Sequence, residues 1–267
     1  MVNKTGRKLL NVEKMLPIVL TLAILGSWEA LSDLRIISPL FYPSSSTILV
    51  TLWQLLVSGK LWTNLAITLN RLGTGLVLGM IPGVVLGFLM GWSRKLRVVI
   101  DPFIAALHPI PKTAIFPLVL ILLGIGESSK VFTIAIATFF PVLINSMAGV
   151  RQINPVYFEV ANNYGARVIN TFTRVILPGS MPMVLVGVRI AFNNTLMITI
   201  ALELLAARTG LGVLIWYAWE TLRTQELYAT LIVIAIIGIL ANYLLQKLTQ
   251  AIVPWSIHVL QEENNPS

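Results

Sequence analysis

Six long apolar runs separated by short polar connections are the feature that most constrains what this chain can fold into. Each run approaches the roughly 20 residues that an α-helix needs to cross the hydrocarbon core of a bilayer. Only 11% of the residues are charged and 56% are hydrophobic, whereas a soluble domain is about one-quarter charged. We therefore predict an all-α polytopic membrane protein with about six transmembrane helices. The predicted spans are 16–34, 66–90, 101–123, 131–150, 182–204 and 228–250.

The chain begins with a basic segment, residues 1–15, directly before the first apolar run. This order is also typical of a signal peptide, but the run continues to about Leu34 without a small-x-small cleavage site. We therefore expect a cytoplasmic N-terminal segment followed by a retained first span. The next segment, 35–65, contains the half-polar stretch SSSTILVTLWQLLVSGKLW, which is too short and too polar to span. We expect this segment to be extracytoplasmic, with a helix lying at the membrane interface.

The basic residues indicate which side of the membrane each connection faces, because cytoplasmic connections are enriched in lysine and arginine. With a cytoplasmic N-terminus, eleven basic residues lie inside: Lys4, Arg7, Lys8, Lys14, Arg94, Lys95, Arg97, Arg151, Arg167, Arg174 and Lys247. Five lie outside: Arg35, Lys60, Lys130, Arg208 and Arg223. This excess predicts that both termini are cytoplasmic. It places the tail 251–267 and the loop 151–180, between the fourth and fifth spans, on the cytoplasmic side.

The chain lacks the residues that thiol chemistry, metal binding and nucleotide binding require. The chain has no cysteine, and its two histidines, His108 and His258, are 150 positions apart without further ligands at metal-binding spacing. The only Gly-Lys pair, Gly59-Lys60, lacks the upstream glycine and the following serine or threonine of a P-loop. The formal charge of +8 is spread between the apolar runs. We therefore expect no catalytic residues, no metal, no cofactor bound by this chain and no nucleic-acid partner.

The second span carries a glycine at every fourth position. On a helix these residues form one stripe of small side chains, which lets a neighbouring helix approach closely in a membrane. We expect this stripe to serve helix packing, and we expect Pro82 to bend the helix. The stripe consists of Gly75, Gly79, Gly83, Gly87 and Gly91.

The third span contains four prolines within sixteen residues, at positions 102, 109, 111 and 117. Proline removes a backbone hydrogen bond, so a regular helix throughout this span is excluded. Broken membrane helices occur where the freed carbonyl groups line a cavity or are covered by protein. His108 and Lys112 are four positions apart at this point, so both side chains could face one side. Lys112 could belong to a transport pathway or could extend to the cytoplasmic interface.

The fifth span is unusually polar, and a charged group in mid-span costs ~2.5–3.5 kcal/mol on insertion scales. Thr195, Thr199 and Glu203 follow helical spacing and form one polar face. That face could line a translocation route or could hydrogen-bond to neighbouring helices. Two adjacent asparagines, Asn193 and Asn194, exceed what helix pairing needs and favour the route. Our candidate pathway residues are His108, Lys112, Arg189, Asn193, Asn194, Thr199 and Glu203.

The loop 151–180 is polar and carries helix signals of its own. Asn154 is a good N-cap, Pro155 suits the first helical position, and Gly165 supplies a C-terminal stop. We predict a short helix over 155–164, followed by a second helix that ends near Pro178. The aromatic residues of the first helix could anchor a protein partner. They are Tyr157, Phe158 and Tyr164.

This loop resembles the EAA loop of ABC importer permeases. That motif reads E-A-A, three residues, G, nine residues, I-x-L-P, and the chain departs from it at Val160 and Val175. In that family the loop forms a coupling helix that sits in a groove on a cytoplasmic ATPase subunit. The resemblance implies that the following residues contact the ATPase: Glu159, Ala161, Tyr164, Gly165, Leu177 and Pro178.

Three further stretches, 69–92, 108–130 and 203–221, resemble the nitrate, sulfonate and taurine branch of these permeases. Within residues 108–130, the motifs P-I-P-x-x-A and G-I-G-E resemble those of aliphatic sulfonate and taurine permeases more closely than those of cyanobacterial nitrate or bicarbonate permeases. The resemblance implies a core over 66–250, in the bacterial inner membrane, that forms the pathway for a small anion such as a sulfonate, taurine, nitrate or bicarbonate. It also implies an ATPase partner that binds ATP and Mg²⁺, an extracytoplasmic solute-binding protein and a second copy of the chain. The alternative is a stand-alone secondary transporter or channel.

Overall fold

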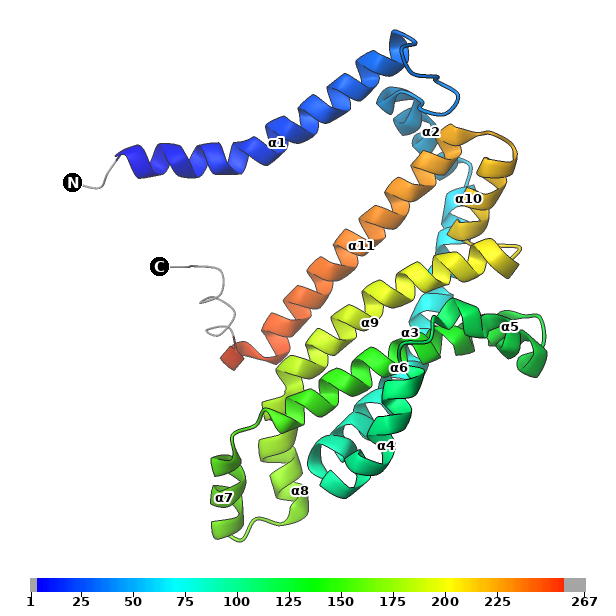
Figure 1. Ribbon diagram of the computed structural model, residues 1–267. Coiled ribbons are helices and arrows are strands. Elements are labelled where there is room, and N and C mark those ends of the chain that lie inside the picture. Colours follow the sequence, from blue (N-terminus) through cyan, green and yellow to red (C-terminus); the bar gives the residue numbers. More distant parts are fainter. Residues whose placement is uncertain (1–3, 257–267) are drawn as a thin grey trace.

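The computed structural model describes residues 4–256, and it describes side chains over residues 15–255. Residues 1–3 of the predicted N-terminal segment and residues 257–267 of the predicted tail, with His258, lie outside the described residues. All the elements of the described chain are helical (Figure 1). They are α1 (Lys4–Asp33), α2 (Ser45–Val57), α3 (Lys60–Trp92), α4 (Arg94–Leu107), α5 (Lys112–Leu123), α6 (Glu127–Arg151), α7 (Pro155–Asn163), α8 (Val168–Thr171), the π-helix η1 (Phe172–Ile176), α9 (Leu177–Ala206), α10 (Leu211–Glu220), α11 (Thr224–Ile252) and the 3₁₀ turn η2 (Pro254–Ser256).

The predicted spans correspond to long apolar helices. Five helices or helix runs of the described chain are long and apolar enough to cross a membrane, and the pair α4–α5 is a sixth candidate. The first, second, fourth and sixth predicted spans fall in α1, α3, α6 and α11. The short helix expected in segment 35–65 is α2. The described residues therefore form a polytopic helical protein with five or six spans.

The third span is broken, as its prolines predict, and it also begins earlier than predicted. The helix α4 starts at Arg94, where the Ser93 hydroxyl accepts a hydrogen bond from the Leu96 N–H at 3.3 Å. It ends at Leu107, and α5 leaves at an angle of 98° after an intervening segment that contains Pro109 and Pro111. The candidate span is therefore a bent pair of helices.

The prediction that a helix ends near Pro178 is wrong, because the chain continues as one apolar helical run from Val168 to Ala206. Pro178 lies in the first turn of α9, and the preceding turn is the π-helix η1. There the Leu177 N–H donates to the Phe172 carbonyl, five residues back. This wider turn accommodates a proline, which has no N–H to donate.

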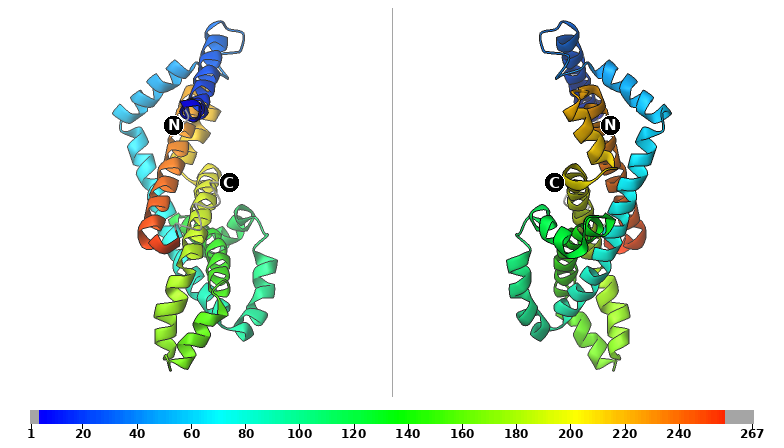
Figure 2. Two further views of the ribbon diagram at one scale, coloured as in Figure 1. Left: turned by 90° about the vertical axis from the view of Figure 1, so that its left-hand side faces the viewer. Right: turned by 90° about the vertical axis from the view of Figure 1, so that its right-hand side faces the viewer.

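The helices α3, α6 and α9 pack together along a seam at the centre of the molecule (Figures 1 and 2). The glycine stripe of α3 faces α6, so the prediction of close helix packing is confirmed. A Cβ atom added to Gly79 would lie 2.2 Å from the Ala135 carbonyl oxygen, and one added to Gly87 would lie 2.6 Å from that of Leu143. On the other side of α6, Gly149 lies against the Ser180 backbone of α9. We call this contact region of α3, α6 and α9 the seam.

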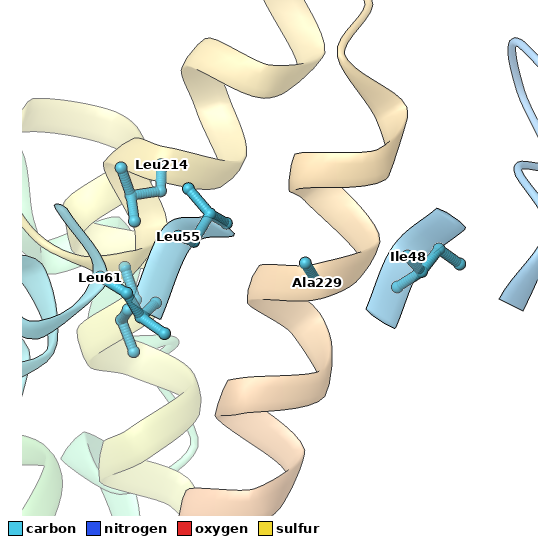
Figure 3. Close-up of a cluster of buried hydrophobic side chains, with 6 residues drawn as sticks. Ile48, Leu55, Leu61, Leu214 and Ala229 are labelled. Carbon is cyan, nitrogen blue, oxygen red and sulfur yellow. The ribbon is translucent and has the colours of Figure 1, made fainter. Parts of the chain in front are cut away.

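A second apolar cluster joins α2, α3, α10 and α11 at the end of the molecule where α1 meets the rest of the chain. Figure 3 shows Ile48 of α2 beside Ala229 of α11, with Leu55, Leu61 and Leu214 gathered nearby. By contrast, α1 runs away from the bundle toward the N-terminus (Figure 1), and only 6% of its apolar window is buried within the chain. The hairpin of α7 and α8 projects at the opposite end of the molecule (Figure 2).

Candidate functional site

The first candidate site is the α7–α8 hairpin. Its first helix, α7, begins at the predicted N-cap residue, Asn154. The Asn154 side-chain oxygen accepts a hydrogen bond from the Val156 N–H at 3.0 Å. Pro155 occupies the first turn of α7, where an N–H would have no intrahelical partner. The helix entry is therefore fixed by two adjacent residues.

The same helix ends in a Schellman motif around Gly165. Gly165 has φ +66°, a conformation that residues with a Cβ adopt only at a cost. Its N–H donates to the Asn162 carbonyl and the Ala166 N–H donates to the Ala161 carbonyl, both at 2.9 Å. The predicted stop is confirmed. Both ends of α7 are thus capped, so nine residues form a stable short helix.

The surface of α7 is open to a partner. No residue of α7 is buried, and Tyr164, directly after it, is 88% exposed. Glu159 and Tyr157 are exposed as well, and Ala161 is half-buried. Phe158 instead packs toward the base of the hairpin, near buried Ile176. The helix is therefore anchored on one side and presents a carboxylate and two tyrosines on its free surface.

The other two residues of the loop motif lie at the base of the hairpin. Leu177 is half-buried and packs in the same cluster as Phe158. Pro178 lines a cleft of about 530 Å³ together with Asn154, Tyr157 and other residues. The structure therefore divides the six predicted coupling residues between an exposed helix and the base that supports it.

The second candidate site is a recess of about 310 Å³ at the break between α4 and α5. It brings together three of the predicted pathway residues, His108, Lys112 and Asn194, which come from the break and from α9. The other side chains that line the recess are apolar. They include Pro109, Ile110, Ala137, Met197 and Ile198.

Lys112 has a role at this break that the sequence did not indicate. Its ammonium donates to the carbonyls of Leu107, His108 and Ile110, at 3.0, 2.9 and 2.8 Å. It also lies 4.4 Å from the centre of the Phe140 ring. Because an ammonium has three N–H donors, these carbonyls use all of them. Lys112 caps the end of α4 and fixes one positive charge beside the recess.

The polar face of α9 contacts neighbouring helices in this structure. The hydroxyl groups of Thr195 and Thr138 lie 3.0 Å apart, and the Asn242 side-chain amide donates to the side-chain oxygen Oδ1 of Asn193 at 2.9 Å. Thr199 and Glu203 are each 1% exposed, so neither lines the recess. These contacts correspond to the second interpretation of this face, hydrogen bonding between helices. Arg189 is half-buried, and it is not among the residues that line the recess.

Glu203 belongs to a charge network that sequence analysis missed, in which Arg71 and Glu203 are buried and Glu127 is exposed. Arg71 of α3 donates to the Glu203 carboxylate at 2.7 Å and to both oxygens of the Glu127 carboxylate at 2.6 and 2.8 Å. Thr68 and the Gly212 N–H also donate to Glu203. The network joins α3, α6, α9 and the start of α10. Two opposite charges within predicted spans, Arg71 and Glu203, were the available signal, because such residues pair with one another.

The folded chain combines a bundle of membrane-length helices, a broken span and a capped hairpin at one end, which is the arrangement of a multi-pass membrane protein with one projecting hairpin. Residues 83–257 match the family described as binding-protein-dependent transport system inner membrane component. The chain belongs to this family and is a multi-pass inner-membrane permease subunit.

Relatives with similar lengths support this assignment. The taurine transport system permease protein TauC of Escherichia coli K12 is 36% identical, and the alignment covers 88% of each chain. The putative aliphatic sulfonates transport permease protein SsuC of Bacillus subtilis 168 is 31% identical over 94% of this chain and 91% of its own. The nitrate import permease protein NrtB of Leptolyngbya laminosa is 29% identical over 85% of this chain and 76% of its own.

The fold also resembles a solved importer. A chain of the MetNI methionine ABC transporter in an inward-facing conformation aligns with a TM-score of 0.61 and 18% identity, over 75% of this chain and 97% of that chain. At this identity the likeness shows the fold alone.

Proposed function

We propose that this chain forms the translocation pathway of an ABC importer for a small anion, with taurine and alkanesulfonates as the first candidates. The higher identity to the taurine permease, 36%, than to the nitrate permease, 29%, supports this order. Nitrate and bicarbonate remain further candidates from the same branch. The chain itself is expected to be non-catalytic, with ATP and Mg²⁺ bound by a separate ATPase.

The observation that carries this proposal is the exposed, doubly capped helix α7. A helix whose ends are fixed by Asn154 and Gly165 can transmit a displacement as a rigid body. Its free surface presents Glu159 and Tyr164 to a partner, while Phe158 ties it to the base of α9. We infer that α7 is the coupling helix: closure of the ATPase pair on ATP moves α7, and the seam helices follow from inward-facing to outward-facing.

The orientation in the membrane follows from the basic residues near this hairpin. Arg94 starts α4, Arg151 ends α6, and Arg167 and Arg174 lie within the hairpin segment. The positive-inside rule therefore supports a cytoplasmic α7. With the bent pair α4–α5 counted as a sixth span, four crossings precede α7 and two follow it, so the rule also supports two cytoplasmic termini.

We propose that the recess at the α4–α5 break lies on the anion pathway. Lys112 would contribute its fixed charge, while His108 and Asn194 would offer exchangeable hydrogen bonds to the solute. The apolar lining around them suits a solute that has an alkyl part beside its anionic group. His108 and Asn194 are exposed in the single chain, which supports a second copy that completes the pathway. An extracytoplasmic binding protein would deliver the solute.

The experiment is import into proteoliposomes that contain the permease, its ATPase and its binding protein. We expect Glu159→Lys and Gly165→Asp to abolish ATP-driven import while the protein still inserts. The matched controls lie away from the hairpin: Glu220→Lys reverses an exposed carboxylate, and Gly59→Asp replaces a glycine with φ +75° and open space around it. Normal import by both hairpin variants would refute the coupling role. Import without any ATPase would favour a stand-alone transporter.

A further inference from the structure

The junction of α1, α2 and α11 contains an apolar groove of about 420 Å³ that the transport site does not include. Leu25 and Leu231 on its walls are 42% and 44% exposed, so the groove is continuous with the outward-facing apolar surface of two candidate spans. From Tyr228 to Ala235 the groove follows α11 for about 10 Å, at 1.5 Å per residue. Its lining includes Leu25, Trp28, Ile48, Tyr228, Ile232 and Ala235.

One wall of the groove holds a hydrogen-bond donor without an acceptor. The Trp28 Nε1 atom is buried and has no hydrogen-bond partner within the described chain. The Trp28 ring packs edge-on against Tyr228, with ring centres 5.5 Å apart. Both aromatic residues lie near the ends of their spans, at Asp33 and Thr224, where tryptophan and tyrosine meet the polar part of a bilayer. A buried donor of this kind needs an acceptor from the occupant.

A polar recess of about 270 Å³ follows along the same three elements. Ser32 lies one turn beyond Trp28 on α1, and Gln225 lies one turn before Tyr228 on α11. The recess also contains Asp33 and Arg35. Neither charge forms a salt bridge with residues that the structure describes. The recess therefore offers one positive and one negative group beside the apolar groove.

We propose that this junction binds one zwitterionic glycerophospholipid whose head group carries a primary amine. The phosphate pairs with Arg35, because a guanidinium matches phosphate geometry, and the amine pairs with Asp33. An ester carbonyl accepts the Trp28 N–H, and one acyl chain lies in the groove beside Ala235. The lipid fills the space where α1 separates from α11 and so holds α1 against the bundle.

The test is binding of dioleoyl phosphatidylethanolamine to the purified full-length chain in detergent, measured by native mass spectrometry. We expect Arg35→Gln and Trp28→Phe each to weaken binding about tenfold. Ala235→Phe fills the groove with a ring and should abolish binding. Phosphatidylglycerol, which lacks the amine, should bind about tenfold more weakly than phosphatidylethanolamine to the unmodified chain.

Three exposed residues away from the groove provide matched controls, Arg208→Gln, Trp62→Phe and Ile121→Phe, and each should bind lipid as the unmodified chain does. Equal lipid binding by Ala235→Phe, with an unchanged unfolding temperature, would overturn the proposal. Equal binding of the two phospholipids would also overturn it. If Ala235→Phe changed self-association and left lipid binding intact, the occupant would be a second copy instead.

Discussion

The seam and the α7–α8 hairpin both depend on glycine, but for opposite reasons. In the seam, Gly79 omits a side chain, because a Cβ atom there would meet the Ala135 carbonyl at 2.2 Å. In the hairpin, a Cβ atom added to Gly165 would meet no atom within 4 Å, so glycine is required there only by its φ of +66°. The seam is thus built for contact within the chain and the hairpin for contact outside it. Substitutions in the seam should change folding, whereas substitutions in the hairpin should change transport.

The largest expected effect is at Arg71, which pairs with Glu203 inside the seam. Arg71→Met removes the cation and leaves a carboxylate that is 1% exposed without its charged partner. Breaking a buried pair in this way typically costs ~3–5 kcal/mol. We expect a correspondingly lower stability in chemical denaturation of the detergent-solubilised protein.

The double variant Arg71→Met/Glu203→Leu separates the loss of the ion pair itself from the cost of leaving the Glu203 carboxylate buried without a charged partner. Since it removes the uncompensated charge, it should recover at least half of the lost stability. If the double variant is as unstable as the sum of the two single variants, the network does not act as a pair.

A somewhat smaller effect is expected at Gly79. Overpacking a close interface costs ~1–3 kcal/mol, and Gly79→Leu should reach the upper end because backbone atoms of α6 must move. Gly73→Leu, on the same helix with nothing within 4 Å, is the control and should stay within ~1 kcal/mol. Thermal unfolding of both variants measures the difference. Equal losses would show that the stripe does not set the contact of α3 with α6.

The smallest effect is expected at the entry of the hairpin. Asn154→Ala removes the cap of the Val156 N–H and should destabilise α7 by ~1 kcal/mol. Amide hydrogen exchange over 155–164 should then accelerate about fivefold, with global stability unchanged. Asn154→Asp retains a capping oxygen and should exchange as the unmodified chain does. The seam should unfold at the same rate in both variants and in the unmodified chain. A global loss of stability would contradict the separation of the two regions.

Local patterns in the sequence were sufficient to predict one feature of each region: the glycine contact of the seam and the limits of α7 in the hairpin. The four-residue spacing of the glycines predicted the close contact of α3 with α6, because a helix places such residues on one face. Asn154, Pro155 and Gly165 predicted the limits of α7, because caps act through neighbouring backbone groups. The prolines likewise predicted a break in the third span.

Other features depend on the tertiary structure and were not predictable in this way. The continuation of the helix through Pro178 depends on a π turn, which leaves no distinct sequence signal. The capping of α4 by Lys112 depends on the 98° bend that brings its ammonium back to the carbonyls. The pairing of Arg71 with Glu203 joins residues 132 positions apart, and a polar face alone does not identify its partner.

The most direct test of the central claim, that α7 contacts the ATPase, is photo-crosslinking from tyrosine positions at the two ends of the molecule. A photoreactive phenylalanine replaces either Tyr164, which is 88% exposed after α7, or Tyr217, which is 53% exposed on α10. We expect an ATPase adduct from position 164 and none from position 217, in membranes that still import solute. An adduct from position 217, or none from 164 in an active transporter, would contradict it.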